Sequence, residues 1–246
     1  MKVITIAIQK GGTGKTTTAA ALAQAAAYKG RRVLAIDLDP QGQLGFTLAA
    51  DNSRNRGNAY NLLSGIRAQD LIQTTPQGVD IIPAAWDLQT VTSGPGSARR
   101  LQKAIEPLKR EYDVIIIDTP PTAGELQYNA LQAATGLIIP LQADIYNLQS
   151  LYQITDTARQ IQGSNPGLVI KGFVLSQYDG RSTIARQMKE TIIDTAEKLE
   201  VPYLGTIRQA VAVKEAAALQ RSLFEYAPKS KPAADYMELY ETLANN

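Results

Sequence analysis

One stretch decides the fold: Gln9-Lys10-Gly11-Gly12-Thr13-Gly14-Lys15-Thr16-Thr17. It follows an apolar, mostly β-branched run over residues 3–8 and precedes an alanine-rich run over residues 18–27. This order is typical of a strand, a loop and a helix. Glycines let backbone N–H groups converge on an anion, and the unsatisfied donors of the helix N-terminus point to the same place. The stretch therefore predicts a phosphate-binding loop.

The side chains of this loop have distinct expected roles. Lys15 adds a point charge for the terminal phosphates of a nucleotide, and the Thr16 hydroxyl is placed to bind Mg²⁺. The usual pattern G-x-x-x-x-G-K-[ST] would have glycine at position 9, where this chain has Gln9. It has instead a second lysine, Lys10, ahead of two glycines. The predicted nucleotide-binding residues are Lys10, Gly11, Gly12, Thr13, Gly14, Lys15, Thr16 and Thr17.

The string K-G-G-x-G-K-T resembles the deviant Walker A motif of the ParA/MinD family of ATPases. The resemblance implies an α/β fold with one doubly wound, mostly parallel sheet and helices on both faces, formed by residues 1–246 as a single P-loop ATPase domain. It implies ATP and Mg²⁺ as cofactors. In this family the extra lysine, here Lys10, reaches across a dimer to the nucleotide of the partner.

Composition excludes several classes of protein. The 246 residues include 25 Lys and Arg against 23 Asp and Glu, so any basic surface must be local. Cysteine and histidine are both absent, which excludes disulfides, thiolate or imidazole metal sites, iron–sulfur clusters and a histidine base. The N-terminus resembles neither a signal peptide nor a membrane span. A soluble cytoplasmic protein is expected.

The second motif is acidic and follows the next predicted strand, residues 32–36. This strand is apolar on both faces, as in a parallel sheet, and it leads into Asp37-Leu38-Asp39-Pro40-Gln41-Gly42. Open α/β sheets bind their ligands at the carboxyl ends of such strands. D-x-D-P-Q-G is also a ParA-family block, and the resemblance assigns Asp39 to orienting the attacking water and Asp37 to the Mg²⁺ environment.

The third motif is Tyr112-Asp113-Val114-Ile115-Ile116-Ile117-Asp118-Thr119-Pro120-Pro121. Its β-branched residues predict a central strand, and Asp118 at the end of that strand is placed as a Walker B aspartate that holds the Mg²⁺ hydration shell. The predicted metal-site residues are thus Thr16, Asp37 and Asp118, the aspartates acting through water. The Thr-Pro-Pro continuation is stiff because each proline fixes its own φ. In the ParA family it belongs to a switch that senses the γ-phosphate.

Alternating strands and helices are expected along the rest of the chain. Trp86, the only tryptophan, is expected to be a packing residue, and residues 51–57 and 93–97 are expected to be loops. Further strands are predicted over residues 79–84, 136–142 and 168–176. Helices are predicted over residues 58–64, 67–73, 98–110, 125–134, 147–162 and 183–199.

The last third carries a modest basic surplus, with ten Lys and Arg against seven Asp and Glu between residues 171 and 231. Five of these cations fall at predicted helix starts and loops, where a phosphate backbone can be reached. The resemblance marks Arg181 as a DNA-backbone contact, but Ala212 replaces a family arginine implicated in DNA binding. The predicted DNA-binding residues are Arg181, Lys214, Arg221, Lys229 and Lys231.

The resemblance as a whole predicts a bacterial, nucleoid-associated partition ATPase. ATP and Mg²⁺ would form a homodimer that binds double-stranded DNA without sequence preference, and a ParB-like centromere-binding protein would stimulate hydrolysis. Lys10, Lys15 and Asp39 would be the catalytic residues. No helix-turn-helix domain is expected, since no extension precedes the first strand. The alternative is a MinD-like or other cargo-positioning ATPase that acts on a membrane or a protein assembly. MinD-like membrane binding is disfavoured, because it needs a basic amphipathic helix at the carboxyl end and residues 233–241 are acidic.

Overall fold

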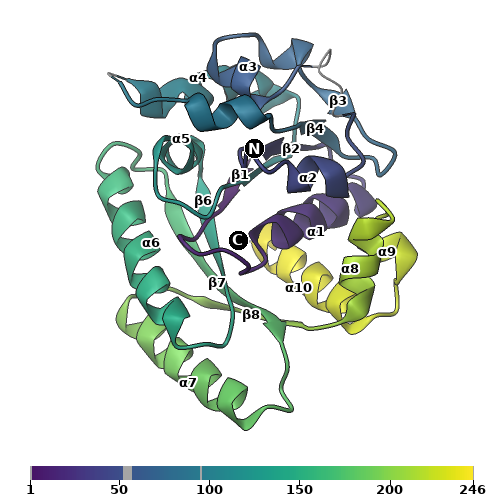
Figure 1. Cartoon of the computed structure of the whole chain (residues 1–246), viewed down its shortest axis with the longest axis vertical. Coiled ribbons are helices and arrows are strands. Elements are labelled where there is room, and N and C mark those ends of the chain that lie inside the picture. The colour runs from purple at the N-terminus through teal and green to yellow at the C-terminus, as the bar shows by residue number, and fades with distance from the viewer. Residues whose placement is uncertain (1, 52–56, 95, 246) are drawn as a thin grey trace.

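A single sheet organises the computed structural model, which describes residues 2–51, 57–94 and 96–245. Among these residues the sheet has eight strands in the order β3-β4-β2-β5-β1-β6-β7-β8 (Figure 1). Every neighbouring pair is parallel except β3 and β4, which are antiparallel. The predicted doubly wound, mostly parallel sheet is confirmed. The predicted loop over residues 51–57 lies mostly outside the described residues, as does position 95 of the loop over residues 93–97.

The strands are short and buried where they lie in the middle of the sheet. The central strands β1, β2 and β5 are rich in isoleucine and valine because helices cover both of their faces. The strands are β1 (Lys2–Ile6), β2 (Val33–Asp37), β3 (Gln73–Thr74), β4 (Asp80–Ile82), β5 (Val114–Asp118), β6 (Gly136–Leu141), β7 (Val169–Tyr178) and β8 (Tyr203–Arg208).

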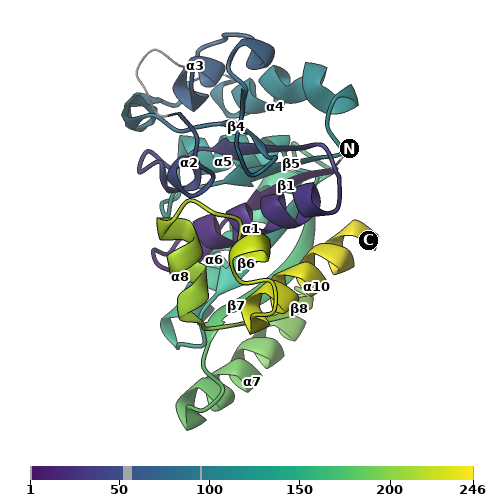
Figure 2. The ribbon, with the colours of Figure 1, turned by 90° about the vertical axis from the view of Figure 1, so that its right-hand side faces the viewer.

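Helices cover the two faces of the sheet in two groups. The first group packs on one face and comprises α1 (Lys15–Tyr28), α2 (Gln43–Thr47), α8 (Val211–Ala218), α9 (Leu223–Tyr226) and α10 (Lys231–Asn245). Figure 2 shows α1, α8 and α10 in front of the sheet. The second group packs on the other face and comprises α3 (Ala59–Leu63), α4 (Arg100–Ile105), α5 (Glu125–Ala133), α6 (Tyr146–Gln162) and α7 (Thr183–Lys198).

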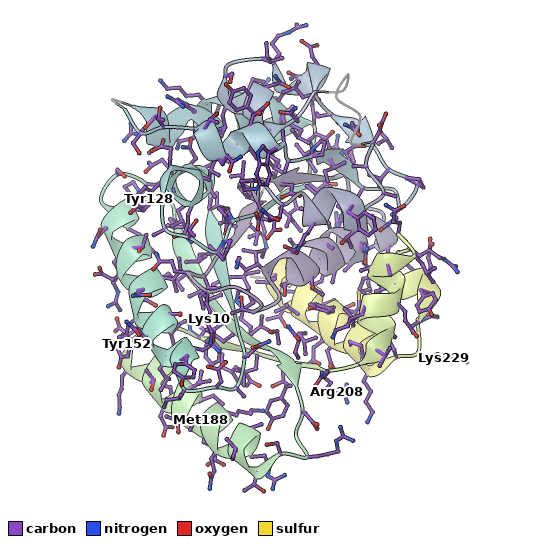
Figure 3. All side chains as sticks on the ribbon, in the orientation of Figure 1. Lys10, Tyr128, Tyr152, Met188, Arg208 and Lys229 are labelled. Carbon is purple, nitrogen blue, oxygen red and sulfur yellow. The ribbon has the colours of Figure 1, made fainter. Side chains whose placement is uncertain are left out.

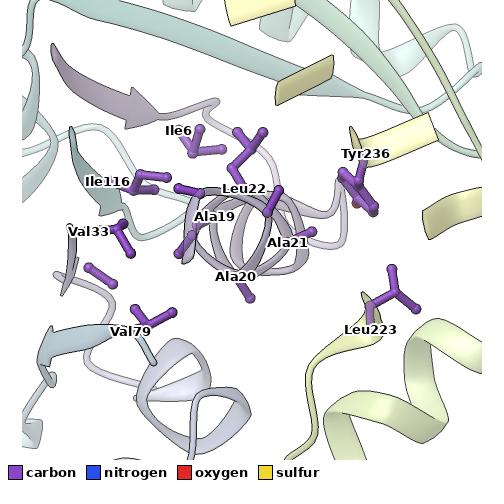
Figure 4. Close-up of a cluster of buried hydrophobic side chains, with 14 of the residues drawn as sticks. Ile6, Ala19, Ala20, Ala21, Leu22, Val33, Val79, Ile116, Leu223 and Tyr236 are labelled. Atoms are coloured by element: carbon purple, nitrogen blue, oxygen red, sulfur yellow. The ribbon is translucent and has the colours of Figure 1, made fainter. Parts of the chain in front are cut away.

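Helix α1 is rich in alanine because it is packed on nearly every side. Its residues from Thr18 to Ala26 are all buried, between the sheet on one side and α9 and α10 on the other. Figure 4 shows this helix end-on, with Ile6, Val33 and Ile116 of the sheet on one side and Tyr236 and Leu223 on the other. Small side chains allow this close approach, and alanine is also the best helix former. The helix that follows the phosphate loop is therefore held rigidly in the core.

Two of the predicted helices are wrong in their extent. Residues 67–73 form only a short 3₁₀ turn (Ala68–Asp70) before the chain enters β3. The Gln73 side chain accepts a hydrogen bond from the backbone N–H of Asp51 and donates one to the backbone carbonyl of Asp51. These tertiary contacts override the local helix preference. Residues 98–110 contain α4 with a 3₁₀ turn at each end, and the second turn holds Pro107, which lacks an N–H and interrupts a helix.

The expectation for Trp86 is also wrong. Its side chain is 64% exposed at the start of a 3₁₀ turn (Trp86–Thr90), whereas Leu88 of the same turn is fully buried. A large apolar side chain such as tryptophan is expected to pack in the core. A short turn, however, can direct only some of its side chains into the core, and the others face solvent. Here the buried side chain is the leucine.

Candidate nucleotide and magnesium site

The three predicted motifs meet at one edge of the sheet. The phosphate loop follows β1, while Asp37 and Asp118 are the last residues of β2 and β5. These strands are neighbours, and their register places Asp118 opposite both Asp37 and Ile6. The carboxyl ends of parallel strands form the ligand-binding edge of an α/β sheet. The structure therefore brings the loop and both aspartates together.

The loop has the backbone shape that the glycines predict. Gly12 and Gly14 have φ angles of 75° and 83°, in the left-handed region that only glycine adopts readily. Gly14 is also the N-cap of α1, where no side chain caps the first N–H groups. These donors remain available for an anion, and the helix dipole favours negative charge at the same point. The loop fits the phosphates of a nucleotide.

Lys15 lies beneath this loop and is almost completely buried. Its side chain is 6% exposed, and Nζ donates a hydrogen bond of 2.8 Å to the carbonyl of Lys10. Burial lowers the pKa of the Lys15 ammonium, and the charges of Asp118 and Asp39 act in the opposite direction. A buried cation with one backbone partner has donors left for phosphate oxygens.

Asp118 is a fully buried carboxylate with one oxygen left over. Its Oδ1 accepts the backbone N–H of Thr119 at 3.1 Å, whereas Oδ2 has no hydrogen-bond partner among the described residues. Burial raises the pKa of Asp118, while the Thr16 hydroxyl and the Lys15 ammonium lower it. A buried carboxylate oxygen without a partner is unfavourable unless a cation or its water shell satisfies it. This orphaned oxygen beside Thr16 fits a hydrated Mg²⁺.

Asp37 has a structural role that the sequence did not reveal. Its Oδ1 accepts the N–H of Asp39 at 3.0 Å, and Oδ2 accepts the N–H groups of Leu44 and Gly45 at 3.1 Å each. Burial, and next the charge of Asp118, raise the pKa of Asp37 well above its ordinary value. Three backbone donors occupy its two oxygens, so Asp37 anchors the start of α2 beside Asp118.

Asp39 lies two residues further on, at the rim of the same edge. It is 9% exposed, and its Oδ1 accepts the N–H of Gln41 at 3.1 Å. The turn is closed by a hydrogen bond from the N–H of Gly42 to the carbonyl of Asp39. A carboxylate at the rim, close to a buried ammonium, is suitably placed to hold a water molecule near a terminal phosphate.

Lys10 is directed toward α6 of its own chain. Its Nζ lies 2.9 Å and 3.0 Å from the two carboxylate oxygens of Asp144 and 5.6 Å from the ring centre of Tyr146. Figure 3 labels Lys10 beside α6. Asp144 lies 134 residues from Lys10 in the sequence, and no local signal identifies it as the partner of Lys10.

A cavity of about 110 Å³ continues from the start of α1 toward α8. Its walls come from Gly14 and Thr17 at the start of α1, Gln177 near the end of β7, and the segment of residues 207–210 that ends β8 and leads into α8. It lies beside the phosphate loop and the first turn of α1, where the nucleoside half of a nucleotide held by the loop would extend.

Comparison with known proteins supports the same assignment. Residues 1–170 match the family described as AAA domain. The chain is 35% identical to the sporulation initiation inhibitor protein Soj of Bacillus subtilis strain 168, over 100% of this chain and 99% of Soj. It is 36% identical to the chromosome partitioning protein ParA of Myxococcus xanthus strain DK1622, over 97% of this chain and 86% of that protein.

Two solved structures extend the comparison to bound ligands. The cobyrinic acid a,c-diamide synthase of Mycobacterium smegmatis with ADP and magnesium has a TM-score of 0.86 at 32% identity, over 100% of this chain and 94% of that one. The septum site-determining protein MinD of Pyrococcus horikoshii with Mg-ADP has a TM-score of 0.82 at 29% identity, over 98% of this chain and 95% of that one. The chain belongs to the ParA/MinD family. Adenine nucleotide and Mg²⁺ are therefore its cofactors.

This ParA/MinD-family chain also has a basic cavity beside the nucleotide site. Its volume is about 630 Å³, and three of the five predicted DNA-binding residues, Arg181, Lys214 and Lys231, line it. Arg208 lines it too, and sequence reasoning missed this residue. Figure 3 labels Arg208 at the end of β8. The guanidinium of Arg208 is paired with Asp235 of α10. Arg181 forms a two-bond fork with Asp179 at 2.9 Å, which lowers the pKa of Asp179 to about 2.

The other two predicted DNA-binding residues lie elsewhere. Arg221 lines a small separate cavity with Thr17 and Gln24, and its guanidinium lies 5.8 Å from the ring centre of Tyr226. Lys229 is exposed in the turn before α10 and does not line the basic cavity. Among the described residues, no helix is long and apolar enough to cross a membrane.

One polar network ties the acidic edge to the region of α8 and α9. Gln77, in the turn between β3 and β4, donates hydrogen bonds to the carbonyls of Thr47 at 2.8 Å and Gln220 at 2.9 Å. Its own carbonyl oxygen accepts the amide of Gln24 on α1 at 2.8 Å. The amide of Gln220 in turn donates to the carbonyl of Phe46 in α2. The end of the short helix anchored by Asp37 is thus joined to the end of α8.

Proposed function

We propose that this chain is a DNA partition ATPase whose DNA binding depends on the bound nucleotide. The observation that carries the proposal is that two cavities share a wall: Lys214, together with residues 208–210, lines both the nucleoside cavity and the basic cavity. A nucleotide that orders this wall would also order the cations on its other side. The similarity to a chromosome partitioning ParA supports the same function.

Each residue of the site has a role in this proposal. Residues 10–17 hold the phosphates, and Lys15 neutralises charge that develops on the β- and γ-phosphates. Thr16 and Asp118 hold hydrated Mg²⁺, with Asp37 anchoring the start of α2 beside Asp118. When bound, Mg²⁺ neutralises phosphate charge. Asp39 orients the water that attacks the γ-phosphate in line.

The proposal also includes a dimer and two partners. Lys10 is the residue that reaches the nucleotide of a second copy, so ATP favours a homodimer. The basic cavity then contacts the phosphate backbone of double-stranded DNA without reading its bases. A dimer presents two such surfaces, which raises affinity through effective concentration. A ParB-like protein stimulates hydrolysis and releases the chain from the nucleoid.

The test is a mobility-shift titration of random duplex with ATP, ADP or no nucleotide. Asp39→Ala should bind ATP without hydrolysing it and should shift duplex in ATP alone. Arg181→Glu should weaken binding to all sequences alike while ATP-dependent dimerisation is unchanged. Arg67→Glu is the matched control, because Arg67 forms a similar fork with Asp70 at 3.0 Å but lines neither cavity. Absence of duplex binding by the Asp39→Ala variant in ATP at low salt contradicts the proposal.

The second candidate is a cargo-positioning ATPase, which the similarity to MinD favours. Its membrane form needs a free amphipathic helix at the carboxyl end. In this chain the apolar side of α10 is already used, because Tyr236, Leu239 and Leu243 are buried in the core. A sedimentation assay with anionic vesicles, in ATP and ADP, separates the two candidates: binding to vesicles but not to duplex supports the second.

A further inference from the structure

Three side chains hold the phosphate loop from the side that faces the ends of β6 and β7. The carbonyl of Gly12 accepts the amide of Gln142 at 2.9 Å and the amide of Gln177 at 3.0 Å. The carbonyl of Thr13 accepts the hydroxyl of Ser176 at 2.6 Å. Gln142 directly follows β6, while Ser176 and Gln177 belong to the end of β7. None of these residues belongs to the nucleotide-binding motifs of the sequence.

The geometry of the peptide bond gives these contacts a consequence on the opposite side of the loop. A trans peptide is planar, so its C=O and N–H point in opposite directions. The carbonyl of Gly12 shares its peptide with the N–H of Thr13, and the carbonyl of Thr13 shares its peptide with the N–H of Gly14. When both carbonyls are held toward the ends of β6 and β7, both N–H groups point away from these strands, to the opposite side of the loop. Converging N–H groups of this kind form an anion-binding nest.

We propose that Gln142, Ser176 and Gln177 are positioning residues that orient the Gly12–Thr13 and Thr13–Gly14 peptides toward the phosphates of the nucleotide. The inference rests on the proposed nucleotide function of the loop and adds residues to it. These side chains act through the backbone and touch no reacting atom. Their effect is preorganisation, because the donors already point at the anion before it arrives.

The backbone of Gln177 supports this assignment. Its φ angle is 51°, in the left-handed region, which is uncommon for a residue that is not glycine. Such conformations persist where surrounding structure over-determines them, and they gather at functional sites. Here the conformation places the Gln177 amide on the carbonyl of Gly12, 165 residues away in sequence.

The two glutamines act redundantly on one acceptor. A carbonyl oxygen has two lone pairs, and each amide occupies one of them. Loss of one glutamine leaves the Gly12 carbonyl held by the other, whereas loss of both frees the peptide. Among the residues that the structure describes, no second side chain donates to the carbonyl of Thr13. The single glutamine variants should therefore have small effects, and the double variant an effect larger than their sum.

The experiment measures the binding of ADP and AMP, with Mg²⁺, by isothermal titration or competition. ADP carries the second phosphate that the loop encloses, and AMP does not. Gln142→Ala and Gln177→Ala should each weaken ADP binding about twofold. The double variant and Ser176→Ala should each weaken it about tenfold, because a net hydrogen bond contributes roughly that factor. AMP affinity should stay constant in Gln142→Ala, because Gln142 does not line the nucleoside cavity, and the melting temperature of the nucleotide-free chain should stay constant in both single glutamine variants.

The matched control is Gln160→Ala, an exposed glutamine of α6 whose amide bonds Asp156 and not the loop. It should bind both nucleotides as the wild type does. An unchanged ADP affinity in the double variant overturns the inference, and so does an equal loss for AMP and ADP. A wild-type chain that binds no ADP overturns the proposed nucleotide function itself. These outcomes separate the inference from the function on which it rests.

Discussion

Asp144 holds Lys10 within its own chain, although the proposed dimer needs Lys10 at the nucleotide of a second copy. The pair has contacts of 2.9 Å and 3.0 Å. The Lys10–Asp144 ion pair must break each time the proposed dimer forms, so it stabilises the monomer relative to the dimer. In the wild type, the Asp144 carboxylate accepts hydrogen bonds from the backbone N–H groups of Tyr146 and Asn147 at the start of α6. Asp144→Asn removes the negative charge but keeps a side-chain oxygen that can accept these two bonds. We expect this variant to dimerise more tightly in ATP.

The size of the effect follows from the exposure of the pair. The Lys10 and Asp144 side chains are 25% and 36% exposed, so water partly screens their attraction. A pair of this kind contributes about 1 kcal/mol. Each dimer opens two of them, so the variant should favour the dimer by about 2 kcal/mol. That corresponds to a dimer dissociation constant about 30-fold lower.

The assay is sedimentation equilibrium in ATP, with Asp39→Ala present in both proteins so that the nucleotide is not hydrolysed. Asp156→Asn is the control, because this α6 carboxylate bonds Gln160 and not Lys10. A dissociation constant that is unchanged or higher in Asp144→Asn, with melting temperature and ATP affinity preserved, refutes the reasoning. It would mean that the Lys10–Asp144 contact persists in the dimer or contributes nothing to the monomer.

Three further changes test other parts of the structure. Asp179→Asn should free Arg181 for phosphate and steepen the slope of log DNA affinity against log salt by about 0.9 for each arginine engaged, as measured by titration at several salt concentrations. Gly172→Ala should lower the free energy of unfolding by about 2 kcal/mol or more in urea titration, since the new Cβ would lie 2.3 Å from the carbonyl oxygen of Pro202. Without nucleotide, stability should fall as pH rises from about 4 to 7, because burial raises the pKa of Asp118 to about 7 and the folded state therefore holds a proton that the unfolded state has lost. Melting temperatures across this range should show the fall, and Asp118→Asn should reduce it.

The parts of the site that could be predicted are those where local sequence and the rules of parallel sheets suffice. The glycines of the loop specify left-handed positions, and Asp37 and Asp118 each end a run of apolar residues. Parallel strands bring such ends to one edge, so their proximity follows without knowledge of any long-range contact.

The parts that could not be predicted depend on contacts between distant segments. Asp144 meets Lys10 across 134 residues, and nothing near either residue indicates the pairing. Gln142 and Ser176 reach the loop from two other strands, and glutamine and serine are common on surfaces. Sequence grouped Arg181 and Lys229 together as predicted DNA-binding residues, and only the packing of distant segments determines that Arg181 lines the basic cavity whereas Lys229 does not.

The contacts of Gln77 predict how substitutions at this residue would behave in a genetic screen. One side chain links the backbone at Thr47, just after the acidic edge, to the backbone at Gln220, just after α8. A substitution at Gln77 would leave both ends of that link with unsatisfied carbonyls. Under the proposed function, such a substitution would alter ATP hydrolysis and DNA binding together. The Gln77 side chain joins the end of α2 to the end of α8. Second-site substitutions that restore function to a Gln77 variant should therefore lie in α2 or α8.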